Sequence, residues 1–223
     1  MNLIELQNIT FTYETDEPPV LNGLSLSLHQ GSCLIVKGEN GSGKTTLFRI
    51  LNGLSFPQKG SFWFDGMEIT EKYLKDNRHS KLFHKRIGYL FQNPDIMLFC
   101  GKVYDEIAFG PRQLGMTEKE TAERVRDCME QFGISELSEK APYHLSGGQK
   151  KKVALAAVIA LNPEVLILDE PYAGLDGGTI QQLTDFLKNY KAAGRTLIIA
   201  THSETLGEEL GDEFLTLQGG RIL

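Results

Sequence analysis

The sequence predicts an α/β fold in which a mostly parallel sheet is covered by helices on both faces. Compact apolar segments have the length of buried strands, and they lie at residues 33–36, 165–168 and 197–200. Segments with apolar residues at helical spacing accompany them, at residues 47–54, 147–161 and 179–190, and Gly53 marks the end of the first helix. Apolar strands that alternate with helices are typical of parallel sheets with both faces buried.

Further strands are expected outside these segments. Ile9, Phe11 and Tyr13 alternate with threonines, and leucines alternate with serines over residues 24–28, so each segment predicts a strand with one buried face. Residues 61–69 and 214–223 predict hairpins because each contains a glycine-rich turn, at Asp65-Gly66 and at Gly219-Gly220. The full set of these strand and hairpin segments is 9–13, 24–28, 61–69, 87–91 and 214–223.

Helices are expected to dominate between residues 92 and 145. One of them begins at Thr117, where Glu120 completes a capping box, and it ends near Gly133. The longest apolar run, Val153 to Leu161, is far shorter than the roughly 20 residues that a membrane-spanning helix needs. We therefore expect that the chain does not cross a membrane and carries no signal peptide.

Composition restricts the class of protein. The 223 residues are enough for one large α/β domain. The 29 acidic and 23 basic side chains give a net charge of −6, which argues against a nucleic-acid partner because such proteins usually present a basic surface. Cys33, Cys100 and Cys128 form no CxxC pair, so we interpret them as buried, reduced thiols in a reducing compartment.

Residues 38–45 match the phosphate-loop pattern G-x-x-x-x-G-K-[ST] in full, between a buried strand and an amphipathic helix. Backbone N–H groups of such a loop converge on phosphate oxygens, Lys44 would reach the β- and γ-phosphates, and Thr45 would offer its hydroxyl to Mg²⁺. A glycine-rich turn without a ligand is the alternative. The pattern predicts a P-loop NTPase with a RecA-like core, whose nucleotide contacts are Gly38, Glu39, Asn40, Gly41, Ser42, Gly43, Lys44, Thr45 and Thr46.

The apolar strand at residues 165–168 ends in two carboxylates, Asp169 and Glu170. Ligands of open α/β sheets bind at this carboxyl edge. Asp169 fits the acid that supports Mg²⁺ in P-loop enzymes, and Glu170 is placed to polarise a water in line with the γ-phosphate. An ordinary strand end that meets solvent is the alternative, but the upstream phosphate loop favours the functional interpretation.

The string Leu145-Ser146-Gly147-Gly148-Gln149 resembles the signature motif of ATP-binding cassette (ABC) proteins. A serine followed by two glycines at a helix start is a second possible anion site, with Ser146 as the capping residue. Other segments resemble motifs of the same family in the same order. Tyr13 matches the aromatic residue that stacks on adenine in the family, although it could instead be a core residue of its strand. Gln92 matches the glutamine of the Q-loop, and His202 matches the switch histidine. Residues 173–176 resemble the D-loop.

This resemblance implies one ABC ATPase domain over residues 1–223. Its core and an N-terminal antiparallel β subdomain would occupy residues 1–91 and 146–223, with a helical subdomain at about 92–145. The resemblance also implies ATP and Mg²⁺ as cofactors, with Thr45, Gln92 and Asp169 as metal ligands. The catalytic residues would be Lys44, Gln92, Glu170 and His202.

In this family a second ATPase subunit, identical or different, completes each ATP site. The resemblance therefore implies that Ser146, Gly147 and Gly148 contact the nucleotide of the partner and that Asp176 links the two sites across the interface. ATP binding would close this dimer, and hydrolysis would release it.

A finer resemblance concerns residues 91–95, 98–99 and 106–111, which are similar to ATPases of the energy-coupling factor group. That group powers uptake of cobalt, nickel or vitamins in prokaryotes. The resemblance implies a transmembrane coupling subunit that docks near residues 92–111, a substrate-binding membrane subunit reached indirectly, and a peripheral location at the cytoplasmic face of the cell membrane. The alternatives are the ATPase of another ABC importer or exporter, and a non-transport ABC protein in DNA repair or translation.

Overall fold

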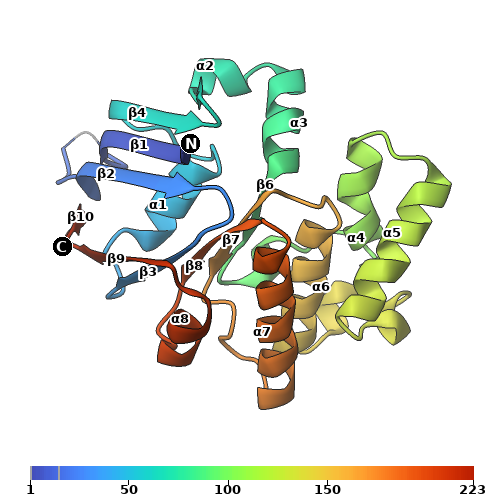
Figure 1. Cartoon of the computed structure of the whole chain (residues 1–223). Coiled ribbons are helices and arrows are strands. Elements are labelled where there is room, and N and C mark those ends of the chain that lie inside the picture. The colour runs from blue at the N-terminus through green and yellow to red at the C-terminus, as the bar shows by residue number, and fades with distance from the viewer. Residues whose placement is uncertain (1, 15) are drawn as a thin grey trace.

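The structure, a computed structural model, describes residues 2–14 and 16–223, and the strands of these residues form two sheets (Figure 1). The first sheet is antiparallel, with the strand order β2-β1-β4-β5. Its members are β1 (Asn2–Phe11), β2 (Leu21–His29), β4 (Lys59–Phe64) and β5 (Met67–Glu68). This sheet is the antiparallel β subdomain that the sequence predicted.

The second sheet has the order β10-β9-β3-β8-β7-β6 and is parallel from β9 to β6. The short strand β10 pairs with β9 in the antiparallel direction, and the two form the predicted hairpin. The members are β3 (Cys33–Gly38), β6 (Ile87–Leu90), β7 (Val165–Asp169), β8 (Thr196–Ala200), β9 (Glu213–Gln218) and β10 (Arg221–Ile222). Parallel pairing brings the carboxyl ends of β3, β6, β7 and β8 to one edge.

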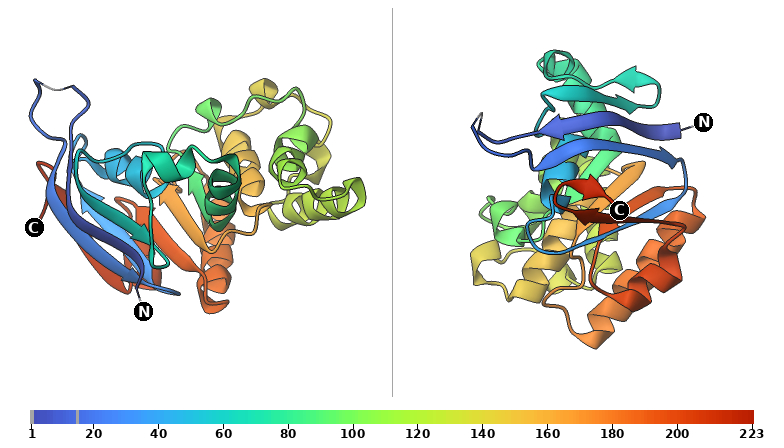
Figure 2. Two further views of the ribbon diagram at one scale, coloured as in Figure 1. Left: turned by 90° about the horizontal axis from the view of Figure 1, so that it is seen from above. Right: turned by 90° about the vertical axis from the view of Figure 1, so that its left-hand side faces the viewer.

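Helices cover both faces of the parallel sheet, and a group of helices extends beyond it (Figures 1 and 2). Around the core lie α1 (Lys44–Leu51), α6 (Gly147–Ile159), α7 (Gly177–Ala192) and α8 (Glu204–Leu210). The helices α2 (Glu71–Leu74) and α3 (Asn77–Arg86) follow the antiparallel sheet, whereas α4 (Val103–Gln113) and α5 (Glu118–Gln131) project from the side of α6. The molecule therefore has a β layer at one end and a helical region at the other (Figure 2).

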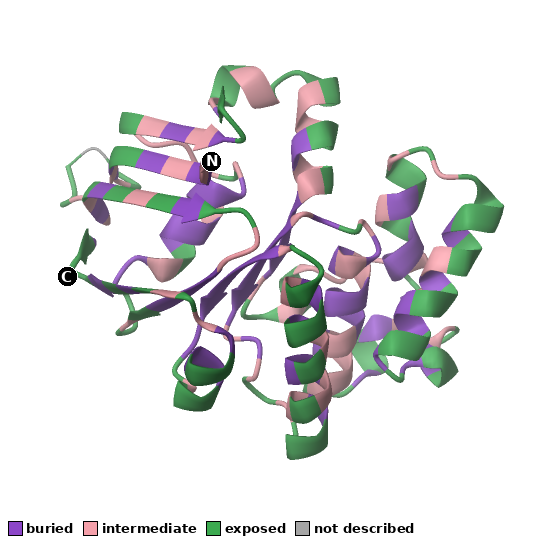
Figure 3. Cartoon of the chain, in the orientation of Figure 1, coloured by how far each residue is buried: buried purple, intermediate pink, exposed green. Residues whose placement is uncertain are grey.

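The central strands β3, β7 and β8 are buried over most of their length (Figure 3). Their successive apolar residues enter two separate cores, one on each face of the sheet. In β7, Val165 and Ile167 pack with α1 and the antiparallel sheet. Leu166 and Leu168 pack with α4, α5, α6 and α7 on the other side. Each face of the sheet thus buries a continuous apolar surface, the dominant stabilising contribution in such a fold.

The sequence predictions concerning element ends were partly wrong. The strand expected at residues 9–13 starts at Asn2 and stops at Phe11, so Tyr13 lies outside it and is 56% exposed. The helix whose end the sequence marks at Gly53 does stop there: its last residue is Leu51, and Gly53 takes a left-handed φ of 64°. Leu54, which the apolar spacing included in this helix, lies beyond its end and is exposed. Cys33 and Cys128 are buried as expected, but Cys100 is partly exposed; all three are free.

The predicted capping box of α5 is confirmed. The Thr117 backbone N–H donates to Glu120 Oε2 at 2.8 Å, and the Glu120 N–H donates to Thr117 Oγ1 at 3.3 Å. Within the described part of the chain, no helix is long and apolar enough to cross a membrane.

Candidate functional site

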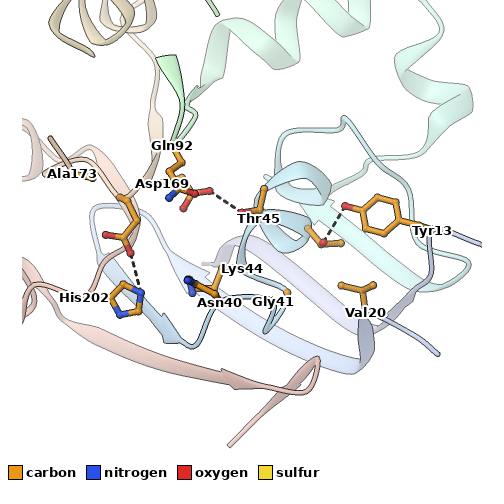
Figure 4. A pocket seen from close by; sticks show the side chains of 13 residues that line it. Tyr13, Val20, Asn40, Gly41, Lys44, Thr45, Gln92, Asp169, Ala173 and His202 are labelled. Carbon is orange, nitrogen blue, oxygen red and sulfur yellow. Dashed lines mark hydrogen bonds and ion pairs between the residues drawn. The ribbon is translucent and has the colours of Figure 1, made fainter. Parts of the chain in front are cut away.

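A pocket of about 690 Å³ opens at the carboxyl edge of the parallel strands (Figure 4). At this edge the pocket is lined by the loop and helix start that follow β3, by the second residue after β6 and the second residue after β8, and by residues 169, 170 and 173 at and after the end of β7. Tyr13 and Val20 close one side of the pocket. The lining residues that the sequence predicted are Tyr13, Asn40, Gly41, Gly43, Lys44, Thr45, Thr46, Gln92, Asp169, Glu170 and His202.

The phosphate loop joins β3 to α1, and it requires a glycine at Gly43, the residue directly before the helix. Gly43 has a φ of 107°, and a Cβ atom on it would lie 2.8 Å from the Leu21 side chain. A larger residue would therefore displace the loop from β2. Lys44 Nζ donates to the carbonyl oxygens of Gly38, at 2.5 Å, and Glu39, at 3.0 Å, so its charge lies over the loop.

Among the described residues, the buried hydroxyl of Ser42 has no hydrogen-bond partner. Gly38, Glu39 and Ser42 support the loop but do not line the pocket.

Asp169 and Thr45 lie side by side in the pocket. Thr45 Oγ1 donates to Asp169 Oδ2 at 3.0 Å, and Asp169 is only 3% exposed. Burial raises the pKa of the Asp169 carboxyl above its ordinary value, although the Thr45 hydrogen bond and the Lys44 charge oppose this shift. The Thr45 hydroxyl, the Asp169 carboxylate and the exposed side-chain amide of Gln92 offer oxygen atoms as metal ligands. Such a set fits Mg²⁺, which prefers oxygen ligands and usually keeps several coordination positions for water and phosphate.

Glu170 has an unusual backbone and an unpaired carboxylate oxygen. Its φ is 47°, a left-handed conformation that costs a non-glycine residue about 1–3 kcal/mol. Oε1 is buried and accepts no hydrogen bond from any described residue. His202 Nε2 lies 3.5 Å from Oε1, within ion-pair distance, but the two atoms form no hydrogen bond. The structure thus places a carboxylate at the pocket wall on a strained backbone, and its Oε1 accepts no hydrogen bond from the described residues.

Tyr13 stands at the pocket mouth and is not a strand core residue. Its hydroxyl forms a hydrogen bond of 3.1 Å with Thr46 Oγ1, and its ring packs edge-on against Phe11 at 4.9 Å. Val20, which lies beside it in the pocket lining, was not found from the sequence. A single valine before a strand gives no sequence signal that it lines a pocket. Its place in the lining becomes apparent only from the structure, in which Val20 lies close to Gly43 of the phosphate loop.

The signature residues do not line this pocket. Ser146 caps α6 as predicted, because its Oγ accepts from the Gln149 N–H at 3.3 Å and its own N–H donates to Gln149 Oε1 at 3.0 Å. Ser146 and Gly147 are exposed, and Gly148 is partly exposed. The structure therefore places the phosphate loop and the signature apart within one chain.

Asp176 also lies outside the pocket lining and caps α7. Its two carboxylate oxygens each accept a hydrogen bond of 2.9 Å from Thr179. These bonds lower the pKa of Asp176.

Comparison with known proteins gives consistent matches over most of the chain. The family model described as ABC transporter matches residues 21–173. The nickel import ATP-binding protein LarO of Lactiplantibacillus plantarum is 44% identical over 213 residues, which cover 96% of this chain and 88% of LarO.

Two solved structures have the same fold. The first is cbiO1 from Clostridium perfringens, described as part of the ABC transporter complex cbiONQ, with a TM-score of 0.84 and 33% identity over 100% of this chain and 87% of cbiO1. The second is the ATP-binding cassette MJ0796, solved as a dimer in a post-hydrolysis state with ADP and Pi. It has a TM-score of 0.90 and 25% identity over 98% of this chain and 96% of MJ0796. The chain belongs to the ABC transporter family and is an ATP-binding, ATP-hydrolysing subunit of such a transporter.

Proposed function

We propose that this chain hydrolyses Mg²⁺-bound ATP at a site shared with a second ATPase subunit, and that it thereby powers nickel or cobalt uptake of the energy-coupling factor type. The observation that carries this proposal is the free Oε1 atom of Glu170, buried at the wall of a pocket that also contains a phosphate loop. The likeness to the nickel import protein LarO and to cbiO1 supports the nature of the cargo.

The residues of the pocket divide between binding and chemistry. The phosphate loop would cradle the phosphates through its N–H groups, and Tyr13 would stack on the adenine. Thr45, Asp169 and Gln92 would hold Mg²⁺, which neutralises phosphate charge when it is bound. Glu170 would accept a proton from the attacking water, and His202 would contact the γ-phosphate.

The second subunit would supply the signature. Ser146, Gly147 and Gly148 form an exposed start of α6, where backbone N–H groups and the positive end of the helix dipole favour an anion. The pocket of the same chain does not use these residues, so we propose that they face the nucleotide of the partner. The dimeric structure of MJ0796 supports this arrangement.

A lysine substitution tests the nucleotide site. We expect Lys44→Ala to weaken ATP binding about 10- to 100-fold, because hydrogen bonds to charged groups contribute roughly 1.5–3 kcal/mol. Calorimetric or fluorescence titration with ATP measures this loss. Lys37→Ala is the matched control, since Lys37 lies on β3, the strand before the phosphate loop, and faces the Phe214 ring outside the pocket. Equal ATP affinity of wild type and Lys44→Ala would contradict the assignment.

The segment after Gln92 presents apolar side chains to solvent. Phe99 is 67% exposed and meets Phe109, which is also exposed, edge-on at 5.0 Å. The buried carboxylate of Glu106 holds this loop, because its Oε2 accepts from the N–H groups of Phe99, at 2.9 Å, and Cys100, at 2.7 Å. An apolar surface on a rigid support is typical of a binding site for a partner.

We therefore propose that the transmembrane coupling subunit docks on residues 92–111, within a helical subdomain of about 92–145. The chain would then lie at the cytoplasmic face of the membrane and would reach the substrate-binding subunit only through this coupling subunit.

The docking surface has its own test. We expect Phe99→Asp to reduce nickel or cobalt uptake by the assembled transporter strongly while the isolated chain still folds and binds ATP. Phe99 is better suited than Leu98, because Leu98 also packs against the core. Met67→Asp is the control, since Met67 is an exposed apolar residue of the antiparallel sheet. Uptake of the labelled ion and co-purification of the membrane subunits are the measurements; normal values for Phe99→Asp would contradict the docking site.

A further inference from the structure

Lys151 is a buried lysine in the first half of α6. The residue is only 3% exposed, although it lies in a run of lysines at residues 150–152. Its Nζ donates to the carbonyl oxygen of Glu170 at 2.8 Å and to that of Ala173 at 2.9 Å. An ammonium group is expensive to bury unless such acceptors surround it, so these contacts constitute a specific link between α6 and the residues after β7.

The two carbonyl groups belong to the turn that carries the proposed catalytic carboxylate. The Ala173 N–H donates back to the Glu170 carbonyl at 3.2 Å, so residues 170–173 form one tight turn. Lys151 joins both ends of this turn to the helix. Because Glu170 adopts a left-handed backbone there, the turn needs support from outside to keep its conformation.

The same helix begins with the signature. A Cβ atom on Gly148 would lie 3.6 Å from the carbonyl oxygen of Gly174 and 3.8 Å from the Leu175 side chain. The start of α6 therefore packs directly on the D-loop, and one turn later Lys151 is bonded to residues 170 and 173. The signature, the D-loop and the catalytic turn are connected through this one helix.

We propose that Lys151 is a positioning residue for ATP hydrolysis, which holds the Glu170 turn to the signature helix. When Ser146 moves against the nucleotide bound by the partner, the movement is thereby transmitted to Glu170 of the same chain. That Glu170 belongs to the other of the two ATP sites. This inference rests on the proposed function, in which Glu170 acts as the general base and Ser146 contacts the nucleotide of the partner.

Steady-state kinetics of Lys151→Met test the inference. Methionine fills the space of lysine but donates no hydrogen bonds, so the carboxylate loses its exact orientation. We expect kcat to fall roughly 10- to 100-fold, the effect of a small misplacement of a catalytic group. The KM for ATP should stay within about twofold, because the phosphate loop is untouched. Lys151→Gln retains N–H donors and should recover most of kcat.

A matched control separates positioning from stability. Lys191 also donates to a backbone carbonyl, that of Leu210 at 2.8 Å, but it lies outside the pocket lining. Lys191→Met should lower the midpoint of urea unfolding without changing kcat. If Lys151→Met does not fold, the Gln variant decides: a folded Lys151→Gln whose loss appears in KM and not in kcat would overturn the proposal.

A double mutant distinguishes failure of this inference from failure of the proposed function. In the Glu170→Gln background, Lys151→Met should cause no further loss of hydrolysis, because both substitutions disable the same group. If Glu170→Gln is inactive but Lys151→Met hydrolyses ATP at the wild-type kcat, the role of Lys151 is wrong and the function stands. If Glu170→Gln itself retains the wild-type rate, the proposed base is wrong.

Discussion

Glu170→Gln should abolish most ATP hydrolysis while ATP binding is kept. The amide has the shape of the carboxylate but cannot accept the proton of the attacking water, and loss of one general base costs a factor of roughly 10²–10⁴ in rate. Removal of the negative charge beside the γ-phosphate should also favour retention of ATP. Phosphate release under saturating ATP measures the first effect, and nucleotide titration measures the second.

Glu164→Gln is the control for this substitution. Glu164 immediately precedes the same strand, β7, at the end away from the pocket, where it pairs with Arg86 at 2.7 Å. We expect it to retain the wild-type rate. Hydrolysis by Glu170→Gln at the wild-type rate would mean that another residue is the base, and the free Oε1 atom would then have no role in the chemistry.

Ser146→Arg should abolish ATP-dependent dimerisation and, with it, hydrolysis. In the proposed shared site, the substitution places a bulky side chain at an exposed helix start that would approach a phosphate group of the partner subunit. It also removes the cap of α6 and adds a positive charge at the positive end of the helix dipole. In the Glu170→Gln background, ATP should produce a dimer that analytical ultracentrifugation detects. The double variant with Ser146→Arg should remain monomeric at saturating ATP.

The other capping box provides the control. Thr117 caps α5 with the same hydrogen-bond pattern, but it lies outside the pocket lining. Thr117→Arg should cost a similar capping free energy, about 1 kcal/mol, and still permit the dimer. A dimer that forms equally with Ser146→Arg would contradict the placement of the signature at the interface.

Local sequence patterns predicted much of this structure because the chemistry they describe is local. The phosphate loop at residues 38–45 and the acidic end of β7 lie where the sequence placed them, at the carboxyl edge of a parallel sheet. The caps Thr117 and Ser146 depend only on residues three positions away, and both form as predicted.

The helices α2, α3 and α8 were not predicted. Helix α3 is strongly polar and buries only Phe83, so it has almost no apolar stripe to reveal it. Its N-cap did offer a signal, since Asp76 accepts from the N–H groups of Arg78 and His79. A cap alone is a weak indication without apolar periodicity, because the same residues also begin turns.

The features that depend on contacts between distant segments could not be predicted from the sequence. A run of three lysines at residues 150–152 indicates exposed side chains, so the sequence gives no reason to expect Lys151 to be buried. It is buried because α6 packs against the turn at residues 170–173. The left-handed backbone of Glu170 likewise has no sequence signal, since no glycine marks it.

The central claim is that two chains share each ATP site, and a mixture of two inactive variants tests it most directly. A dimer of one Glu170→Gln chain and one Ser146→Arg chain contains one site with both defects and one site with neither. If the sites are shared, the mixture should hydrolyse ATP faster than the sum of the separate variants. If each chain forms its site alone, every site remains defective, and a rate equal to that sum would contradict the account.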